Sequence, residues 1–179
     1  MPDTARVALI TGCGKPVGIG NSTARALAAR GVTVVVSDLR PAGVANAFNA
    51  PEDTDANWGG VDALVDAIVK SGGIAASVLG DVSREADAGR MVGEVLARFG
   101  RLDILVNNAG APQGADRNEI EDVPVEAWDL TMGVNAKGAF LMSRAAVPAM
   151  KKQHWGRIVS VSSKAAFRPG RKRATYAAS

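Results

Sequence analysis

Cysteine is almost absent from this sequence, which narrows the classes of protein to consider. Cys13 is the only one among 179 residues, so no disulfide can form within the chain. Nothing therefore points to an oxidising compartment. Long apolar runs are also missing: none approaches the ~20 residues that a membrane-spanning helix needs, and residues 1–4 lack the basic segment of a secretory signal peptide. We expect a cytoplasmic protein with no membrane partner.

An excess of charge of one sign is missing too. The formal net charge is only +3, too small to favour a nucleic-acid partner even though the calculated pI is 9.3. Positive charge gathers in one segment, at Arg168, Arg171, Lys172 and Arg173. That segment could be a solvated loop or could attract an anionic substrate. The only histidine, His154, follows two lysines and a glutamine, and we interpret it as a surface residue at a helix end.

What the sequence does contain is a regular alternation of strand-like and helix-like segments. Five segments are brief, apolar and rich in β-branched residues, as buried parallel strands are. They are Val7–Ile10, Val32–Val36, Ile74–Leu79, Leu102–Val106 and Ile158–Val161. The alternation predicts one doubly wound α/β domain with a parallel sheet, the Rossmann fold, over residues 1–179.

Several of the connecting segments carry helix signals. Residues 61–69 are apolar at positions i, i+3, i+4, i+7 and i+8, which predicts an amphipathic helix covering the sheet. Ser83 is expected to cap a helix that runs to Phe99 and ends at Gly100. A long helix is expected from Val125 to about Gln153, with a kink at Pro148.

Residues 41–60 show no periodicity and are rich in Ala, Asn, Asp and Gly. A structureless connection of this length is uncommon, and usually marks a functional flap or disorder. We interpret the segment as a mobile insertion and assign it no function.

A glycine-rich segment follows the first strand and opens a helix. Glycines in this place let the backbone approach a pyrophosphate, whose charge the helix N-terminus stabilises. The candidate contacts are Thr11, Gly12, Gly14, Gly18, Ile19 and Gly20. A purely structural turn is the alternative. A P-loop is excluded, because Pro16 stands where a Mg²⁺-binding Ser or Thr is needed. We interpret Cys13 as a small turn residue, since no activating base is evident beside it.

An acidic residue, Asp38, closes the second strand. A carboxylate there can accept hydrogen bonds from ribose hydroxyls and would repel a 2′-phosphate, which favours NAD over NADP. Lys15 and Arg40 argue for NADP, as possible phosphate partners. Asp38 could also be a simple helix or turn cap.

Hydroxyl groups end the fifth strand, at Ser162 and Ser163, and Tyr176 opens the helical segment Ala174–Ser179. Ligands of open α/β sheets bind at the carboxyl ends of strands. A serine there that faces a tyrosine is suited to moving a proton at a carbonyl or hydroxyl carbon. The alternatives are a plain strand-end hydroxyl and a half-buried phenol. Asn135 lies within the long predicted helix, where Asn is a poor helix former and needs a reason.

These residues, together with Asn107-Asn-Ala-Gly110, resemble the short-chain dehydrogenase/reductase family. The resemblance implies an NAD(P)-dependent oxidoreductase that transfers a hydride between a nicotinamide and an alcohol or ketone. It assigns proton transfer to Tyr176, substrate orientation to Ser163 and a water-holding role to Asn135. Its further cofactor-binding residues are Asp81, Val82, Asn107, Ala109 and Gly110. A helix-flanking carboxylate for Asp81, a strand-end turn for Asn107 and a solvent-facing Asn135 are the bland alternatives.

The sequence departs from the family pattern in two places. Five residues separate Gly12 from Gly18, where the family has three; Gly14 restores that spacing but follows Cys13 instead of a threonine. The family's catalytic lysine, four residues beyond the tyrosine, would come directly after Ser179. We therefore expect this sequence to be the front part of a longer protein with two more strands. A truncated gene is the alternative.

The resemblance leaves two other functions open. A chain without the lysine could be a non-catalytic dinucleotide-binding remnant or regulatory module. A reductase of carrier-bound β-keto acyl chains is weakly suggested by the basic residues at 168–173. The family also implies a homodimer or homotetramer built on the long helix. No metal is implied.

Overall fold

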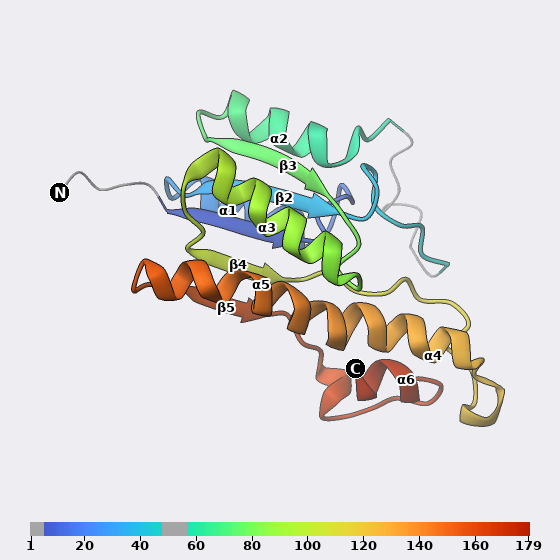
Figure 1. Cartoon of the computed structure of the whole chain (residues 1–179). Coiled ribbons are helices and arrows are strands. Elements are labelled where there is room, and N and C mark those ends of the chain that lie inside the picture. Colours follow the sequence, from blue (N-terminus) through green and yellow to red (C-terminus); the bar gives the residue numbers. More distant parts are fainter. Residues whose placement is uncertain (1–5, 48–56) are drawn as a thin grey trace.

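The computed structural model describes residues 6–47 and 57–179, and its centre is a five-stranded parallel sheet (Figure 1). The strands are β1 (Val7–Thr11), β2 (Thr33–Asp38), β3 (Ala75–Leu79), β4 (Ile104–Asn107) and β5 (Arg157–Ser160). Their spatial order is β3-β2-β1-β4-β5, with every neighbouring pair parallel. The chain first builds outward from β1 to β3 and then returns to place β4 on the other side of β1. The predicted doubly wound α/β fold is confirmed.

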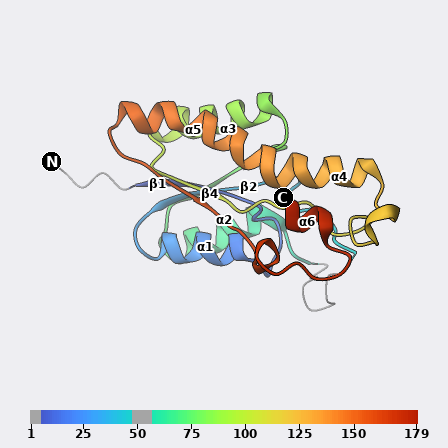
Figure 2. The ribbon, with the colours of Figure 1, turned by 90° about the horizontal axis from the view of Figure 1, so that it is seen from below.

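Helices cover both faces of the sheet: α1 and α2 lie on one face, and α3 and α5 lie on the other (Figure 2). The helices are α1 (Ile19–Ala28), α2 (Gly60–Lys70), α3 (Glu85–Phe99), α4 (Val125–Met132), α5 (Ala139–Lys152) and the short α6 (Ala174–Ala178). Two apolar clusters result, one on each face. Leu64 and Ile68 of α2 are fully buried in the first, and Met91 of α3 and Met142 of α5 are fully buried in the second. The amphipathic pattern of residues 61–69 is thereby confirmed, except at Val69, which is 51% exposed.

The long helix expected from Val125 to Gln153 is present as one unbroken helical run, Val125–Lys152, but it is not α-helical throughout. A π-helical segment, Gly133–Gly138, separates α4 from α5, and Pro148 lies inside α5. Periodicity alone could not reveal this, because one wide turn shifts the phase of the apolar face without removing it.

Ser83 is not the cap of α3, so that prediction is wrong. Arg84 occupies the cap position and makes no side-chain capping bond, while the Ser83 hydroxyl donates to Asp81 Oδ1 at 2.6 Å. The aspartate two residues earlier is the better placed acceptor, so the hydroxyl turns back towards it. The expected end of the helix is correct, since Gly100 adopts the left-handed conformation with φ 72°.

The connection at 41–60 is anchored at both described ends. The Val61 amide donates to the Pro41 carbonyl at 2.8 Å, which closes the connection into a loop. The Trp58 indole donates to the Gly14 carbonyl at 2.8 Å and ties the loop to the glycine-rich segment. The prediction of a mobile insertion also concerns residues 48–56, which lie outside the described part of the chain.

Strand β5 lies at one edge of the sheet, with β4 as its neighbour. All four of its residues are exposed, and so is Val161 just beyond it. Strand β5 therefore presents an exposed edge with the apolar residues Ile158 and Val159. In the described residues, no helix combines the length and the apolar character that crossing a bilayer requires.

Candidate functional site

A two-lobed crevice lies at the carboxyl ends of the strands, beside the ends of β1 and β4. One lobe, of about 570 Å³, is lined by Ser163, Asn135 and Ile19, and we call it the Ser163 lobe. The other, of about 410 Å³, is lined by Asp38, Lys15 and Asp81, and we call it the Asp38 lobe. Residues lining both are Thr11, Val82, Asn108, Ala109, Gly110, Val134 and Tyr176. The two lobes are therefore parts of one site, of a volume usual for ligand pockets.

Thr11 and Asn108 build the floor between the lobes. Thr11 Oγ1 accepts hydrogen bonds from the backbone amides of Asn108 and Ala109, both at 3.0 Å. Asn108 Nδ2 donates in return to the carbonyls of Thr11, at 2.8 Å, and Gly12, at 3.0 Å. The ends of β1 and β4 are thus joined at a fixed separation. Asn108 was not among the predicted contacts, although it stands inside the tetrapeptide that signalled the family.

Two glycines allow the first turn to lie against that floor. Gly12 has φ +73°, and a Cβ there would come 2.8 Å from the Ala109 Cα. A Cβ on Gly20 would come 2.5 Å from the Gly12 carbonyl oxygen. Any side chain at either position would push the start of α1 away from β4.

The N-terminus of α1 is open to a ligand. Gly18 is its cap residue, no side chain caps the helix, and nothing lies within 4 Å of a Cβ built on Gly18. Uncapped amides at a helix N-terminus attract anions. The segment therefore fits a pyrophosphate at this end.

Gly14 and Cys13 face away from the crevice. Gly14 is buried and lines neither lobe; its amide donates to Asp38 Oδ2 at 2.8 Å. Cys13 is 1% exposed, and burial raises the pKa of its thiol to about 12. The thiol therefore stays protonated at neutral pH, in keeping with the interpretation of Cys13 as a small turn residue.

Asp38 combines burial with several hydrogen bonds. Its carboxylate accepts from the amides of Gly14 and Leu39, each at 2.8 Å. Burial raises the pKa of the Asp38 carboxyl above its usual range, against the opposing effect of those bonds and of the Lys15 charge. A carboxylate and an ammonium thus share the Asp38 lobe.

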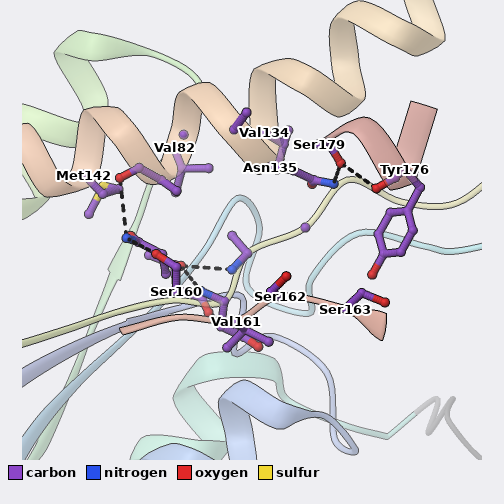
Figure 3. Close-up of a pocket in the computed structure, with 18 of the residues that line it drawn as sticks. Val82, Val134, Asn135, Met142, Ser160, Val161, Ser162, Ser163, Tyr176 and Ser179 are labelled. Carbon is purple, nitrogen blue, oxygen red and sulfur yellow. Dashed lines mark hydrogen bonds between the residues drawn. The ribbon is translucent and has the colours of Figure 1, made fainter. Parts of the chain in front are cut away.

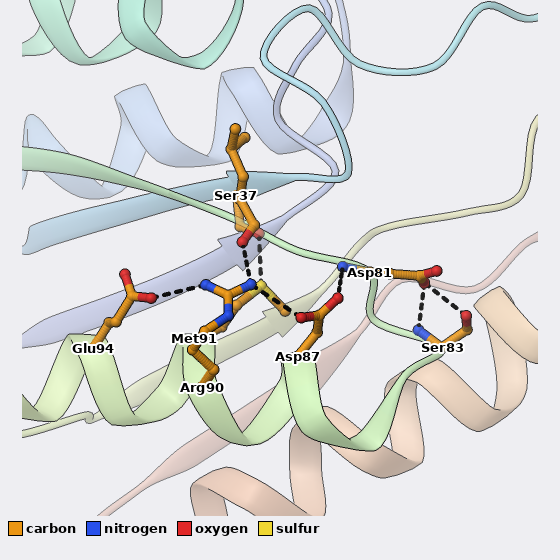
Figure 4. A network of polar contacts seen from close by, with 8 residues as sticks. Ser37, Asp81, Ser83, Asp87, Arg90, Met91 and Glu94 are labelled. Atoms are coloured by element: carbon orange, nitrogen blue, oxygen red, sulfur yellow. Dashed lines mark hydrogen bonds and ion pairs between the residues drawn. The ribbon is translucent and has the colours of Figure 1, made fainter.

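Asp81 and Val82 form the opposite wall of the Asp38 lobe. Asp81 Oδ1 accepts from both the amide and the hydroxyl of Ser83, and the Asp81 amide donates to Asp87 Oδ2 at 3.1 Å (Figure 4). Arg90 in turn bridges Asp87 and Glu94 along α3. This network fixes the backbone turn that carries Asp81 and Val82 into the crevice.

Ser163 and Tyr176 meet in the Ser163 lobe. Ser163 Oγ accepts a hydrogen bond from the Ala165 amide at 3.2 Å, which leaves its own hydrogen free to donate. Tyr176, in α6, directs its phenol end towards Ser163 (Figure 3). The two predicted residues are thereby brought to one wall of one cavity.

Asn135 lies in the π-helical segment, which explains an Asn inside a long helical stretch. Its Oδ1 accepts from the Ala111 amide at 2.8 Å, and its Nδ2 donates to Ser179 Oγ at 2.8 Å (Figure 3). It therefore joins the loop after β4 to the end of α6. Asn107 Nδ2 lies 3.1 Å from Ser143 Oγ and 3.3 Å from Ser160 Oγ, so it links β4 to α5 and β5.

Within the described residues, no group of three or more His, Cys, Asp or Glu side chains could hold a metal ion. Besides Asn108, the crevice residues that were not predicted as site residues include Asn46, Gln113 and Val134. They come from loops and from the π segment, where the sequence carries no periodic signal.

A crevice at the point where a doubly wound sheet reverses its strand order, beside an open helix N-terminus, defines a nucleotide-binding α/β protein. The sequence model of the short chain dehydrogenase family matches residues 6–179. The chain belongs to this family.

Two relatives and two solved structures illustrate the similarity. An uncharacterized oxidoreductase of Thermotoga maritima is 40% identical over 97% of this chain and 60% of its own. D-beta-hydroxybutyrate dehydrogenase of Rhizobium meliloti is 37% identical over 88% of this chain and 54% of its own. A metagenomic short-chain oxidoreductase in complex with NADP has TM-score 0.80 and 32% identity, covering 98% of this chain and 70% of its own. Levodione reductase has TM-score 0.81 and 28% identity, covering 97% and 60%. The chain thus spans a little over half the length of these two relatives.

Proposed function

We propose that the chain is the dinucleotide-binding part of an NAD(P)-dependent oxidoreductase that acts on an alcohol/ketone pair. One observation carries this proposal: Ser163, Tyr176 and Asn135 line one lobe of a crevice whose other lobe is lined by Asp38, Asp81 and Val82. The names of the relatives, among them several oxidoreductases and dehydrogenases, support the same reaction class.

The cofactor would lie across both lobes. The open N-terminus of α1, with Gly18, Ile19 and Gly20, would hold the pyrophosphate, and Asp38 would accept hydrogen bonds from the adenosine ribose. Asp81 and Val82 would border the adenine, while Asn107, Ala109 and Gly110 would border the nicotinamide half. When bound, the nicotinamide supplies or accepts the hydride.

The residues of the Ser163 lobe would handle the substrate oxygen. The Ser163 oxygen accepts from the Ala165 amide, so its hydroxyl hydrogen is free to donate to the substrate oxygen. Tyr176 transfers a proton to that oxygen during reduction and takes it back during oxidation. Asn135 fixes the end of α6 through Ser179, and so supports the turn that carries the tyrosine. The family resemblance adds a lysine four residues beyond Tyr176.

We propose NAD as the preferred cofactor, because the Asp38 carboxylate would repel a 2′-phosphate. Two observations favour NADP: Lys15 lines the same lobe, and a 32% identical structure is in complex with NADP. Parallel fluorescence titrations with NADH and NADPH decide between them, and tighter NADPH binding would overturn the choice of NAD.

The test of the reaction uses the full-length protein with NADH and a panel of ketones. Tyr176→Phe should lower kcat by roughly 10²–10⁴ while the Kd for NADH stays within about twofold, because the lost hydroxyl acts only on the substrate. Ser163→Ala should also lose turnover. Ser162→Ala, at the neighbouring hydroxyl, is the matched control and should keep it. Full activity in Tyr176→Phe would contradict the mechanism, and tight NADH binding without turnover of any ketone would support a non-catalytic module instead.

We also propose self-association through α4 and α5. These helices expose large apolar side chains, at Val125, Trp128, Leu130 and Phe140. A homodimer or homotetramer that buried them would remove this surface from water. Light scattering of the full-length protein tests the proposal.

A further inference from the structure

Arg117 is a buried cation beside the tyrosine of the Ser163 lobe. It lies in the loop between β4 and α4, yet its side chain is only 10% exposed. Its guanidinium carbon is 5.3 Å from the centroid of the Tyr176 ring. That distance is within the range of a cation–π contact. Sequence reasoning did not single out this arginine.

The hydrogen bonding of Arg117 is incomplete. Its Nε is 3.4 Å from Asp116 Oδ2 but makes no hydrogen bond within the described part of the chain. A buried guanidinium nitrogen without a partner is costly. The burial therefore needs offsetting contacts. Two are observed: the Asp116 carboxylate at 3.4 Å and the face of the Tyr176 ring at 5.3 Å.

The loop aims the guanidinium at α6. The Arg117 amide donates to the Gly114 carbonyl at 3.0 Å, and the Gly114 amide donates to Asp116 Oδ1 at 2.7 Å. This tight turn fixes the direction in which the Arg117 side chain leaves the backbone. Farther along the same loop, Glu119 pairs with Arg171 at 2.6 Å, but at the surface, where an ion pair contributes little to stability.

Helix α6 depends on such contacts. It has five residues, Ala174–Ala178, and a helix this short is not stable by itself. The orientation of Tyr176 is therefore set by what packs on it. One end of the side chain faces Ser163 (Figure 3), and the ring face is contacted by Arg117.

We propose that Arg117 is a positioning residue, whose guanidinium stacks on the Tyr176 ring and holds the phenol towards Ser163. The consequence for turnover rests on the proposed function, in which Tyr176 transfers the proton. The stacking itself does not rest on it. Because a small misplacement of a reacting group can cost about 10²-fold in rate, loss of the stacking should lower kcat more than it raises KM.

The stacking can be measured without any activity. Tyr176 is the only tyrosine among the 179 residues, so ring-labelled tyrosine gives this chain one set of ring signals in NMR. In a longer protein the Tyr176 signal is the one lost in Tyr176→Phe. Arg117→Gln should shift that signal and broaden it, since the ring loses the cation over its face. Arg117→Lys, which keeps the charge and is the milder change if Arg117→Gln unfolds, should shift it less.

Arg171→Gln is the matched control. Arg171 also links the segment before α6 to the loop that carries Arg117, but its side chain is 87% exposed. The ring signal in this variant should stay at the wild-type position. An unchanged ring signal in folded Arg117→Gln overturns the stacking, whatever the activity.

The full-length enzyme completes the test. Arg117→Gln should lower kcat about tenfold or more, with the Kd for NADH within about twofold, and Arg117→Lys should restore part of the loss. A shifted ring signal with unchanged kcat overturns the positioning role. Failure of the proposed function is seen separately, as full turnover in Tyr176→Phe.

Discussion

Asp103 shows how a single residue outside the crevice stabilises the sheet. It is fully buried and accepts from the Val7 amide at 2.8 Å, which joins the starts of β1 and β4. Arg101 forms two further bonds to it, each of 2.7 Å. Burial by itself would raise the pKa of the Asp103 carboxyl, but the Arg101 bonds and the Val7 amide outweigh burial and lower it.

The lowered pKa predicts a pH-dependent contribution to stability. A carboxyl whose folded pKa lies below its unfolded value of ~3.9 stabilises the fold above that value. The contribution is lost as the pH falls through the folded pKa. Asp103→Asn should therefore lower the free energy of unfolding by about 3 kcal/mol at pH ~7, because it leaves buried donors unpaired.

Urea unfolding at neutral and at acid pH measures this effect, and the gap between variant and wild type should narrow below pH ~4. Glu94→Gln, in an exposed pair with Arg90, is the control and should change stability far less. A gap that stays constant with pH would mean that the Asp103 charge does not contribute.

At this scale the sequence predicted residues whose chemistry is unusual for their place. Asn135 was noticed because Asn is a poor helix former, and Tyr176 because it follows a serine-ended strand. Arg117 was not noticed, because an arginine in a polar loop is ordinary and only the fold brings its side chain to Tyr176. The Ser83 cap was wrong because Asp81 competes for the same hydroxyl.

Among the elements, the glycine-rich segment is held by the connection that follows β2. Trp58 donates to the Gly14 carbonyl, and a Cβ on Gly14 would come 2.3 Å from the Gly43 amide nitrogen. Asp38 holds the Gly14 amide from a third side. Gly14, which lies in the segment that is longer than the family spacing, is thus fixed in place by the connection and by Asp38.

Trp58→Phe should therefore weaken dinucleotide binding. The variant removes the indole N–H and leaves the Gly14 carbonyl without that donor, a loss of about 1 kcal/mol, or roughly a fivefold rise in Kd for NADH. Fluorescence titration measures the change. Trp128→Phe, at a half-exposed residue of α4, is the control and should bind as the wild type does. Equal Kd values for both variants would show that the connection does not support the cofactor segment.

Element types could be predicted from the sequence because apolar spacing is a local property. The five strands and the helices over 61–69 and after residue 83 follow from it. The π-helical segment could not be predicted, since its signal is a single extra residue in a turn. The anchoring of the 41–60 connection depends on the hydrogen bond from Trp58 to Gly14. This contact joins residues far apart in the sequence, so local patterns do not predict it.

For the whole molecule, the exposed edge strand β5 is the surface most prone to association between chains. Val159 is 52% exposed, and the other three residues of the edge strand β5 are exposed as well. Exposed apolar edge strands promote association between chains. Val159→Lys should lower the concentration-dependent association of this 179-residue chain severalfold, as measured by light scattering. Val69→Lys, at a residue of α2 with 51% exposure, is the control and should have little effect. Equal association in both variants would show that β5 is not the contact.

The doubly wound architecture was predictable because strand and helix alternate without interruption. The crevice was predictable only in part. Thr11 and Asn108, which form its floor, are 97 positions apart, and nothing local in the sequence states that they touch. Their meeting follows from the strand order, which places β1 beside β4.

The π-helical segment Gly133–Gly138 sets the orientation of α4 relative to α5 within the long helical run. One residue corresponds to about 100° of rotation in a regular helix. Removing a residue from this turn would restore regular winding and swing α4 around its own axis relative to α5. Asn135 would then lose both Ala111 and Ser179, while the part of α5 seated on the sheet would stay where it is. The number of residues in the π-helical segment thus determines the rotation of α4 about its axis relative to α5.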